Sequence, residues 1–434
     1  MNSMLNRVAR SLIRTGTLTL TTPDGSTQTY GDGTGKPVHV AVRTRRAAIA
    51  IALDPTLALP EAYMDGTFEV VEGDLLDFLR IAYENQARGG GASPLVSRLL
   101  EGMRNLFRRF QQINTASRAR RNVHRHYDLS GEMYRLFLDG DLQYSCAYFE
   151  RPDATLEEAQ LAKKRHIAAK LDVRHGDSVL DIGCGWGGLG LYLARRFEAG
   201  VLGVTLSTEQ LAVATDRAHD EGLENHVHFE LRDYRSLSER FDRIVSVGMF
   251  EHVGVNHYNA FFEKCATLLK PGGVMVLHSI GRSGVPCATA AFIRKYIFPG
   301  GYIPALSEVM PAIERAGLVV TDIEILRLHY AETLKNWRQR FLANRARAVE
   351  IYDERFARMW EFYLVASEAA FRYQDLMNFQ IQITKKNDTL PITRDYMAAN
   401  EAALAAADMS PIAAVDPEPA KPAARTTRRR TKSA

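Results

Sequence analysis

A strand, a glycine-rich turn and an amphipathic helix follow one another between Ser178 and Phe197, and this segment constrains the fold more than any other. It reads SVLDIGCGWGGLGLYLARRF, with aliphatic residues that suit a buried strand before the turn. Its glycines let the backbone at a helix N-terminus approach a ligand closely. We therefore expect a ligand-binding strand–turn–helix unit of an α/β fold.

The glycine spacing of this turn satisfies the dinucleotide fingerprint, so the pattern alone does not identify the ligand. The next strand, residues 200–207, carries Thr205 and Ser207 where an acid would bind a nicotinamide ribose. Asp181 stands directly before the glycines, where it suits a cationic amine. S-adenosylmethionine has an ammonium and a sulfonium but no pyrophosphate, and it is therefore the cofactor that fits better.

Polar side chains also stand at the ends of the strand-like segments that follow. The series is Asp181, Ser207, Asp233, Glu251 and His278. Strands that alternate with helical segments predict an α/β fold with a doubly wound, mostly parallel, Rossmann-like sheet. Ligands bind such sheets beyond the carboxyl ends of the strands, where we expect these side chains to converge. Asp233 would there accept a hydrogen bond from an adenine amino group.

Six motifs, in order, resemble the cyclopropane fatty acid synthases, a family of bacterial phospholipid enzymes and mycolic acid relatives. They are HYDLSGEMYRLFLD (126–139), QYSCAYFE (143–150), LDIGCGWGG (180–188), SVGMFEHVG (246–254), LHSIG (277–281) and KYIFPGG (295–301). The resemblance covers roughly residues 120–400 and implies the class I methyltransferase fold. It also implies methyl transfer from S-adenosylmethionine to a cis double bond of a lipid acyl chain.

The same resemblance implies four catalytic residues around a bound bicarbonate ion. They are Cys146, Glu251, His278 and Tyr330. Attack of an alkene on the sulfonium methyl leaves a carbocation, so water must be kept out and a base must remove a proton to close the ring. Bicarbonate keeps one OH that can donate to Glu251, while His278 and Tyr330 can donate to its other oxygens. Seven aromatic residues are candidates to stabilise the cation: Tyr144, Tyr148, Phe149, Tyr296, Phe298, Tyr330 and Phe371.

The cofactor site combines the glycine turn with further positions that the resemblance implies. The resemblance puts residues 126–130 over the cofactor as a lid, and it puts Gln380 near the active site without a role. The predicted cofactor-binding residues are Tyr144, Ser145, Asp181, Gly183, Gly185, Gly187, Thr205, Leu206, Gln210, Asp233 and Tyr234. The four cysteines show no CxxC spacing, so we expect neither a metal cluster nor a disulfide framework.

Composition shifts divide the chain into four predicted parts. They are a smaller amino-terminal α+β domain (1–90), a basic amphipathic linker (91–125), the S-adenosylmethionine-dependent catalytic domain (126–405) and a disordered Pro/Ala-rich basic tail (406–434). In the first part, residues 17–22, 37–43 and 47–53 read as strands. Phospholipid enzymes of the family carry an extra amino-terminal domain, which favours intact phospholipid as the substrate.

The last catalytic segment, residues 331–386, is mostly helical by its three- and four-residue apolar spacing. These helices would cover the ligand end of the sheet and wall an acyl tunnel, because a lipid tail needs an apolar lining. Residues 379–386 at its end read as an edge strand.

Charge and hydropathy favour a cytoplasmic enzyme that associates peripherally with the inner face of the membrane. No run of 18 apolar residues exists, and the amino terminus scatters its arginines among apolar residues, unlike a secretory signal. Eight arginines between positions 98 and 125 interleave with apolar residues, and Glu101 is the only acid there. This stretch reads either as an interfacial helix on anionic lipid or as an interdomain helix that packs its apolar face on the protein.

Three functions remain open at this stage. The first is cyclopropane formation on unsaturated phospholipid, and the second is a methyl-branched or methylene fatty acyl lipid formed when the cation loses a different proton. The third is a lipid-binding or regulatory protein without chemistry, against which the intact set of catalytic residues speaks. A nucleic-acid methyltransferase is a weaker fourth, so no nucleic-acid partner is expected; a homodimer stays open.

Overall fold

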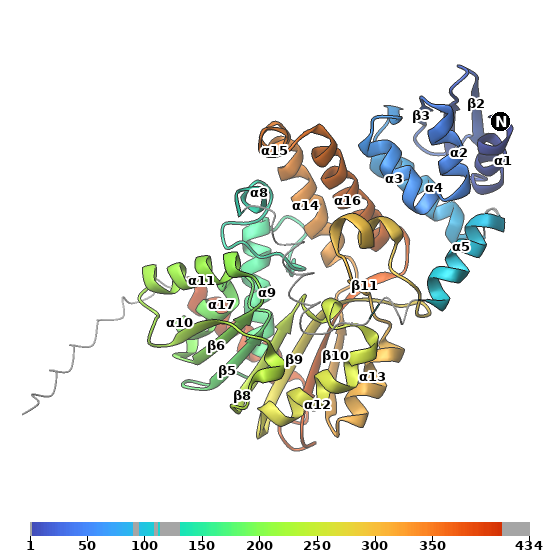
Figure 1. The fold of residues 1–434 in the computed structure, drawn as a ribbon. Coiled ribbons are helices and arrows are strands. Elements are labelled where there is room, and N and C mark those ends of the chain that lie inside the picture. The colour runs from blue at the N-terminus through green and yellow to red at the C-terminus, as the bar shows by residue number, and fades with distance from the viewer. Residues whose placement is uncertain (1, 90–94, 108–111, 113–130, 410–434) are drawn as a thin grey trace, which may run out of the picture.

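Seven strands form the catalytic sheet in the computed structural model, which describes residues 2–89, 95–107, 112 and 131–409 (Figure 1). Their order across the sheet is β10-β11-β9-β8-β5-β6-β7. The bounds are β5 (Ser178–Ile182), β6 (Gly200–Thr205), β7 (Val227–Leu231), β8 (Phe241–Val247), β9 (Leu269–Arg282), β10 (Val319–Ile325) and β11 (Leu376–Thr384). Strands β5 to β9 are parallel, and β11 pairs antiparallel with both β9 and β10. The predicted doubly wound, mostly parallel sheet is therefore confirmed.

Helices cover both faces of this sheet because successive strand residues point to opposite sides. Leu180 and Ile244 face one layer of helices, and their neighbours Val179 and Val245 face the other. The first layer holds α12 (Tyr258–Leu268) and α13 (Leu306–Arg315). The second holds α9 (Leu156–Leu171), α10 (Gly188–Phe197), α11 (Thr208–Asp220) and α17 (Asp395–Met409).

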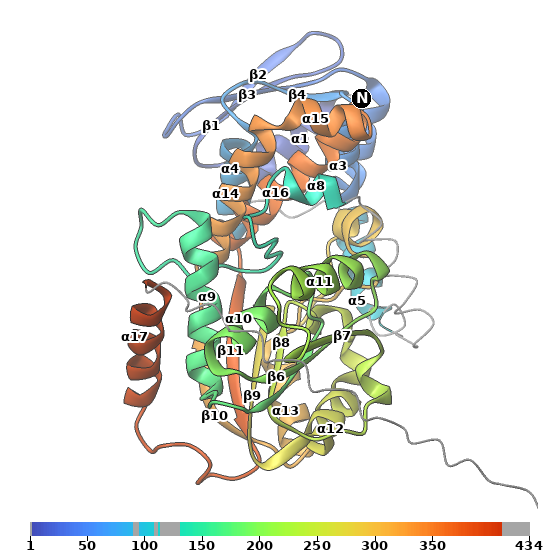
Figure 2. The same ribbon diagram turned by 90° about the vertical axis from the view of Figure 1, so that its left-hand side faces the viewer.

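The helical segment predicted after residue 331 forms three helices that lie beyond one end of the sheet (Figures 1 and 2). They are α14 (His329–Ala343), α15 (Arg345–Ile351) and α16 (Glu354–Tyr373). The short helix α8 (Gly131–Arg135) lies beside them. Loops also contain the short 3-10 helices η1 (Tyr234–Ser236), η2 (Phe250–His252) and η3 (Val255–His257) and the π-helix η4 (Ile293–Ile297).

The predicted edge strand is wrong in its position. Strand β11 lies between β9 and β10, and its residues from Met377 to Thr384 are buried. The sequence signal misled because Gln380 and Gln382, whose side chains look solvent-facing, form buried hydrogen bonds with His278 and with the Lys170 carbonyl.

The amino-terminal residues form a second sheet in the order β2-β1-β3-β4 with four helices. Its elements are α1 (Asn2–Leu12), β1 (Thr17–Thr21), β2 (Thr27–Gly31), β3 (Val38–Val42), α2 (Arg45–Leu53), α3 (Pro55–Met64), β4 (Phe68–Glu72) and α4 (Leu75–Ala87). The predicted strand at 47–53 is wrong, because this segment is helix α2. The Thr44 side chain caps that helix, and its alanine-rich sequence has high helix propensity.

Helices α3 and α4 of the amino-terminal unit pack against α16 (Figure 2). The rings of Tyr63 and Phe362 meet with centroids 5.7 Å apart, and Arg358 donates to the Tyr63 carbonyl at 3.1 Å. Lys295 also forms an ion pair with Glu61 at 2.6 Å. The two units therefore share an interface of apolar and polar contacts.

Helix α5 (Leu95–Leu106) lies in the predicted basic linker. Arg104 forms an ion pair with Asp54 at 2.5 Å, so this arginine holds the helix to the amino-terminal unit. Four apolar side chains of the segment are exposed: Leu99, Met103, Leu106 and Phe107. For these residues, the interpretation in which the apolar face packs on the protein does not hold.

Several sequence predictions fall outside the described residues. They concern the arginines that follow Arg104 in the linker, the lid at 126–130 and the tail from residue 410 onward. Among the described helices, none combines the length and apolarity needed to cross a bilayer. The described residues also contain no cluster of three or more His, Cys, Asp or Glu side chains that could hold a metal ion.

Candidate active site

A cavity of about 180 Å³ opens at the carboxyl ends of β5, β6 and β7, where the glycine turn lies. Ten of the eleven predicted cofactor-binding residues line it: Tyr144, Ser145, Asp181, Gly183, Gly185, Thr205, Leu206, Gln210, Asp233 and Tyr234. The strand ends of a parallel sheet thus bring together residues that are far apart in the sequence.

The three predicted glycines of the turn have different roles in the structure. All adopt positive φ, at 84° for Gly183, 54° for Gly185 and 85° for Gly187. A Cβ on Gly185 would meet no protein atom within 4 Å, so the backbone is free to approach a ligand there. Gly187 does not line the cavity, and a Cβ on it would lie 2.7 Å from the Phe229 ring. The lack of a side chain at Gly187 therefore allows the Phe229 ring to pack against the start of α10.

The two predicted carboxylates of the cavity differ in their surroundings. Burial raises the pKa of Asp181 to about 7, an effect that the positive charge of Lys163 opposes. Asp233 forms an ion pair with Arg235 at 2.6 Å, and both residues line the cavity. An adenine amino group would therefore meet Asp233 together with its arginine, which the sequence pattern did not indicate.

Hydrogen bonds fix the loop between β6 and α11. Thr205 donates to the Gln210 side chain at 2.9 Å and accepts from the Ser207 backbone at 3.1 Å. The Ser207 hydroxyl caps α11 by accepting from the Gln210 backbone at 3.3 Å. Ser207, whose position matched a ribose-binding acid, thus has a capping role here.

A second, larger chamber of about 980 Å³ lies between the catalytic sheet and the amino-terminal unit. All four predicted catalytic residues line it: Cys146, Glu251, His278 and Tyr330. Its walls are mainly apolar and include Leu20 and Phe78 from the amino-terminal unit and Phe362 from α16. Four of the seven aromatic candidates line it as well, namely Tyr144, Phe298, Tyr330 and Phe371.

The cavity and the chamber share four lining residues: Tyr144, Ser145, Gly248 and His252. Tyr144 hydrogen-bonds through its hydroxyl to that of Tyr363 at 2.9 Å, and its ring packs beside Trp337. Burial lowers the pKa of His252 to about 4, so this side chain is neutral near pH 7. A small polar site and a large apolar one therefore meet at a common boundary.

Glu251 is held at the chamber by η2 and β9. Its Oε1 accepts from the Ile280 backbone at 2.6 Å, while its buried Oε2 has no hydrogen-bond partner within the described residues. Burial raises the pKa of this carboxyl to about 7. An unsatisfied buried carboxylate oxygen is costly, so a ligand that donates a hydrogen bond here would be stabilised.

His278 is oriented by the strand next to it. Its Nδ1 lies 3.1 Å from the Gln380 amide nitrogen and its Nε2 lies 3.4 Å from the Asn378 amide nitrogen, so amide groups of β11 flank both ring nitrogens. Burial lowers the pKa of His278 to about 3, so the ring is neutral near pH 7 and carries one N–H. Gln380 is thereby a positioning residue to which sequence reasoning gave no role; its place beside His278 follows only from the register of β9 and β11.

Cys146 and Tyr330 both line the chamber, Cys146 from the segment before α9 and Tyr330 from α14. Burial raises the pKa of the Cys146 thiol, which keeps it protonated and makes a thiolate nucleophile unfavourable. Next to it, the Ala147 backbone donates to Thr333 of α14 at 3.0 Å, which fixes this segment. The Tyr330 ring packs edge-on against Phe371 and Trp337, so its orientation is set by aromatic contacts.

A similar solved structure contains S-adenosylhomocysteine, the product of S-adenosylmethionine after methyl transfer. Mycolic acid cyclopropane synthase CmaA1, complexed with SAH and CTAB, has a TM-score of 0.58 and 35% identity over 61% of this chain and 97% of that chain. The fold and the cavity at the glycine turn define this protein as a class I S-adenosylmethionine-dependent methyltransferase, which confirms the predicted fold and enzyme class.

A family model described as mycolic acid cyclopropane synthetase matches residues 114–381, and the chain belongs to this family. The resemblance inferred from the motifs is thus confirmed. Residues 7–89 match a model described only as a domain of unknown function.

Two named relatives extend the comparison. A probable fatty acid methyltransferase of Pseudomonas putida is 42% identical over 63% of this chain and 72% of its own length. The cyclopropane-fatty-acyl-phospholipid synthase of Escherichia coli K12 is 37% identical over 80% of this chain and 88% of its own length.

Proposed function

We propose that this protein transfers the methyl group of S-adenosylmethionine to a cis double bond of an unsaturated phospholipid acyl chain and forms a cyclopropane ring. The observation that carries this proposal is the boundary at Tyr144 and Ser145, where the polar cavity meets the apolar chamber. A chamber of about 980 Å³ is at the upper end of ordinary ligand pockets, roughly 300–1,000 Å³, and suits a lipid tail. The name of the Escherichia coli relative supports the same substrate class.

The residues of the chain divide the chemistry between the two sites. S-adenosylmethionine, when bound, supplies an electrophilic methyl group at the boundary. Asp181 and the glycine turn would hold the cofactor from the sheet side, while the chamber walls would align the alkene and exclude water from the cation. The faces of Tyr144, Phe298, Tyr330 and Phe371 would stabilise its positive charge.

The chamber residues fit a bound bicarbonate ion. The unsatisfied Oε2 of Glu251 requires a donor, which the OH of bicarbonate would supply, and the single N–H of the neutral His278 ring could donate to another bicarbonate oxygen. When bound, this ion would supply the base that removes a proton from the new methyl group. Glu251 and His278 would orient the ion, and the Tyr330 hydroxyl would donate a hydrogen bond to it. Cys146 would line the same site.

The proposal is tested by incubating purified protein with S-adenosylmethionine, bicarbonate and vesicles of cis-monounsaturated phospholipid. Released fatty acids are measured by mass spectrometry before and after hydrogenation under conditions that spare cyclopropanes. A product one CH2 heavier that takes up no hydrogen supports the proposal. No mass gain, with S-adenosylmethionine demonstrably bound, would contradict it.

A methyl-branched or methylene lipid is the second candidate, favoured by the relative named as a probable fatty acid methyltransferase. Both products come from the same cation, and they differ in which proton leaves. In the same assay, a product one CH2 heavier that still takes up hydrogen would assign the branching reaction instead.

We expect turnover to fall as the pH drops through about 7, because the pKa of Glu251 is raised to that value by burial. Above it the carboxylate can accept a hydrogen bond; below it the protonated carboxyl cannot do so through the same oxygen. The measurement is kcat against pH at saturating S-adenosylmethionine, with the concentration of the bicarbonate anion held constant. A profile without an acid limb, or one that Glu251→Gln leaves unshifted, would contradict this role.

A cytoplasmic location with peripheral binding to the inner face of the membrane is part of the proposal. Leu99, Met103 and Leu106 have the spacing of one helical face, and they are 59%, 51% and 74% exposed. The sequence next to them is rich in arginine, which suits anionic lipid. The division of the chain at residues 1–90, 91–125, 126–405 and 406–434 likewise remains a proposal.

We therefore expect Leu106→Glu to weaken sedimentation with anionic vesicles by roughly tenfold, because it adds an unfavourable charge to an inserted apolar face. Binding of the unmodified protein should also weaken with rising salt. The matched control is Ile392→Glu, which changes an exposed isoleucine elsewhere and should leave sedimentation unchanged. Equal effects of the two substitutions would show that this face does not bind lipid.

A further inference from the structure

Lys163 of α9 is a buried cation at the wall of the polar cavity, and no sequence motif singled it out. It is 1% exposed and lines the cavity together with Gln143, Ser145 and Asp181. Its ammonium donates to the Gln143 side chain at 2.5 Å and to the Ser145 hydroxyl at 2.9 Å. Both acceptors are neutral, and the carboxylates whose charges act on Lys163, those of Asp139 and Asp141, form no direct ion pair with it.

Lys164, the next residue in the helix, differs from Lys163 in having a direct ion-pair partner. Lys164 forms an ion pair with Asp141 at 2.6 Å, whereas no carboxylate of the described residues lies within ion-pair distance of Lys163. Burial lowers the pKa of Lys163 to about 8, because the charged form is unfavourable away from water. A buried cation without a direct ion-pair partner is costly, and a ligand that supplies an anion beside it would be stabilised.

Asp181 presents the opposite charge to the same cavity. It too has no ion-pair partner within 4 Å among the described residues, and Lys163 is the cation whose field reaches it. The methionine end of S-adenosylmethionine is a zwitterion, with one ammonium and one carboxylate on the same carbon. We infer that Lys163 and Asp181 form a subsite for this zwitterion, in which Lys163 binds the carboxylate and Asp181 the ammonium. This inference rests on the proposed use of S-adenosylmethionine.

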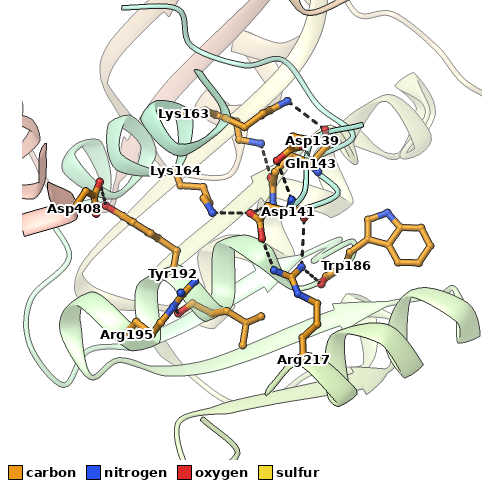
Figure 3. Close-up of polar contacts among 12 residues, drawn as sticks. Asp139, Asp141, Gln143, Lys163, Lys164, Trp186, Tyr192, Arg195, Arg217 and Asp408 are labelled. Carbon is orange, nitrogen blue, oxygen red and sulfur yellow. Dashed lines mark hydrogen bonds and ion pairs between the residues drawn. The ribbon is translucent and has the colours of Figure 1, made fainter. Parts of the chain in front are cut away.

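Gln143 and Ser145, which accept from Lys163, belong to a loop that a network of polar contacts holds in place without a ligand (Figure 3). Asp141 forms ion pairs with both Lys164 and Arg217, and Arg217 donates to the Trp186 carbonyl at 2.9 Å. Gln160 donates to the backbone carbonyls on either side of Tyr144, at 3.2 and 3.1 Å. These contacts tie the loop to α9, α11 and the glycine turn, so binding would require little reorganisation.

The test compares two ligands that differ only in the carboxylate: S-adenosylhomocysteine and its decarboxylated analogue. Their dissociation constants are measured by calorimetry without lipid, so the result does not depend on turnover. The unmodified protein should prefer S-adenosylhomocysteine, and Lys163→Met should weaken that ligand by roughly 10- to 100-fold, the scale of a charged hydrogen bond. The same substitution should leave the analogue nearly unchanged, so the preference disappears.

The control is Lys170→Met, on the same helix and equally buried but outside the cavity. It should keep the preference even if it lowers stability. Equal binding of the two ligands by the unmodified protein overturns the inference without any variant, and so does a Lys163→Met variant that weakens both ligands alike. A lack of binding by the unmodified protein would overturn the cofactor assignment as well, whereas failure of the lipid assay with binding intact would overturn only the proposed reaction.

Discussion

Glu251→Gln should lower kcat by roughly 10²- to 10⁴-fold, the range that a positioned acid–base group contributes, and leave S-adenosylhomocysteine binding nearly unchanged. The substitution preserves the size of the side chain and an oxygen to accept from the Ile280 backbone. It replaces Oε2, which has no partner within the described residues, by an amide that donates instead of accepting. A bicarbonate OH would then face a donor, and its orientation would be lost.

The measurement pairs turnover on phospholipid vesicles with calorimetric binding of S-adenosylhomocysteine. Glu368→Gln is the matched control, because Glu368 is equally buried on α16 but lines neither the cavity nor the chamber. It should cost stability through its pairs with Arg338 and Arg372 and leave kcat near that of the unmodified protein. If Glu251→Gln instead loses cofactor affinity in proportion to turnover, Glu251 belongs to the cofactor site.

The strand ends were predictable from sequence because the rule that locates them is local. A strand, a glycine turn and a helix identify a carboxyl end wherever they occur, so Asp181, Ser207 and Asp233 could be assigned to one edge. The motifs added Cys146 and Tyr330, which lie on elements that the sheet pattern alone does not connect. The structure brings both to the same chamber.

The features that sequence reasoning missed depend on contacts between distant segments, which no local pattern encodes. Alternating alanine and isoleucine made α2 look like a strand, although the Thr44 cap and the burial of successive turns favour a helix. Gln380 acquires its role only because β11 pairs with β9 in a register that puts it opposite His278. Lys163 lies within an ordinary basic stretch of α9, and only the fold turns its side chain toward the cavity.

The chamber is a further feature that sequence could only partly anticipate. Apolar periodicity predicted helices over the ligand end, and α14 and α16 do contribute Tyr330, Phe362 and Phe371 to the lining. The opposite wall comes from the amino-terminal unit, through residues such as Leu20 and Phe78. In the described structure, therefore, the apolar site is completed by two parts of the chain, and the amino-terminal unit contributes to the site as well as to the fold.

Gly185→Val should abolish detectable S-adenosylhomocysteine binding. A Cβ on Gly185 meets no protein atom within 4 Å, so the new side chain would not disturb packing. It would stand at the wall of the cavity, where a ligand must approach the backbone of the glycine turn. The left-handed φ of 54° adds strain for a β-branched residue, and a control must separate this effect from steric exclusion.

Gly176→Val provides that control, because Gly176 also has a positive φ, at 76°, and equally open space around its Cβ, but it lies outside the cavity. Both variants should lose similar stability in thermal unfolding, and only Gly185→Val should lose the ligand. Retained binding by Gly185→Val would contradict the assignment of the glycine turn to the cofactor. Loss of binding in both variants would show that backbone strain, transmitted to β5, is the cause.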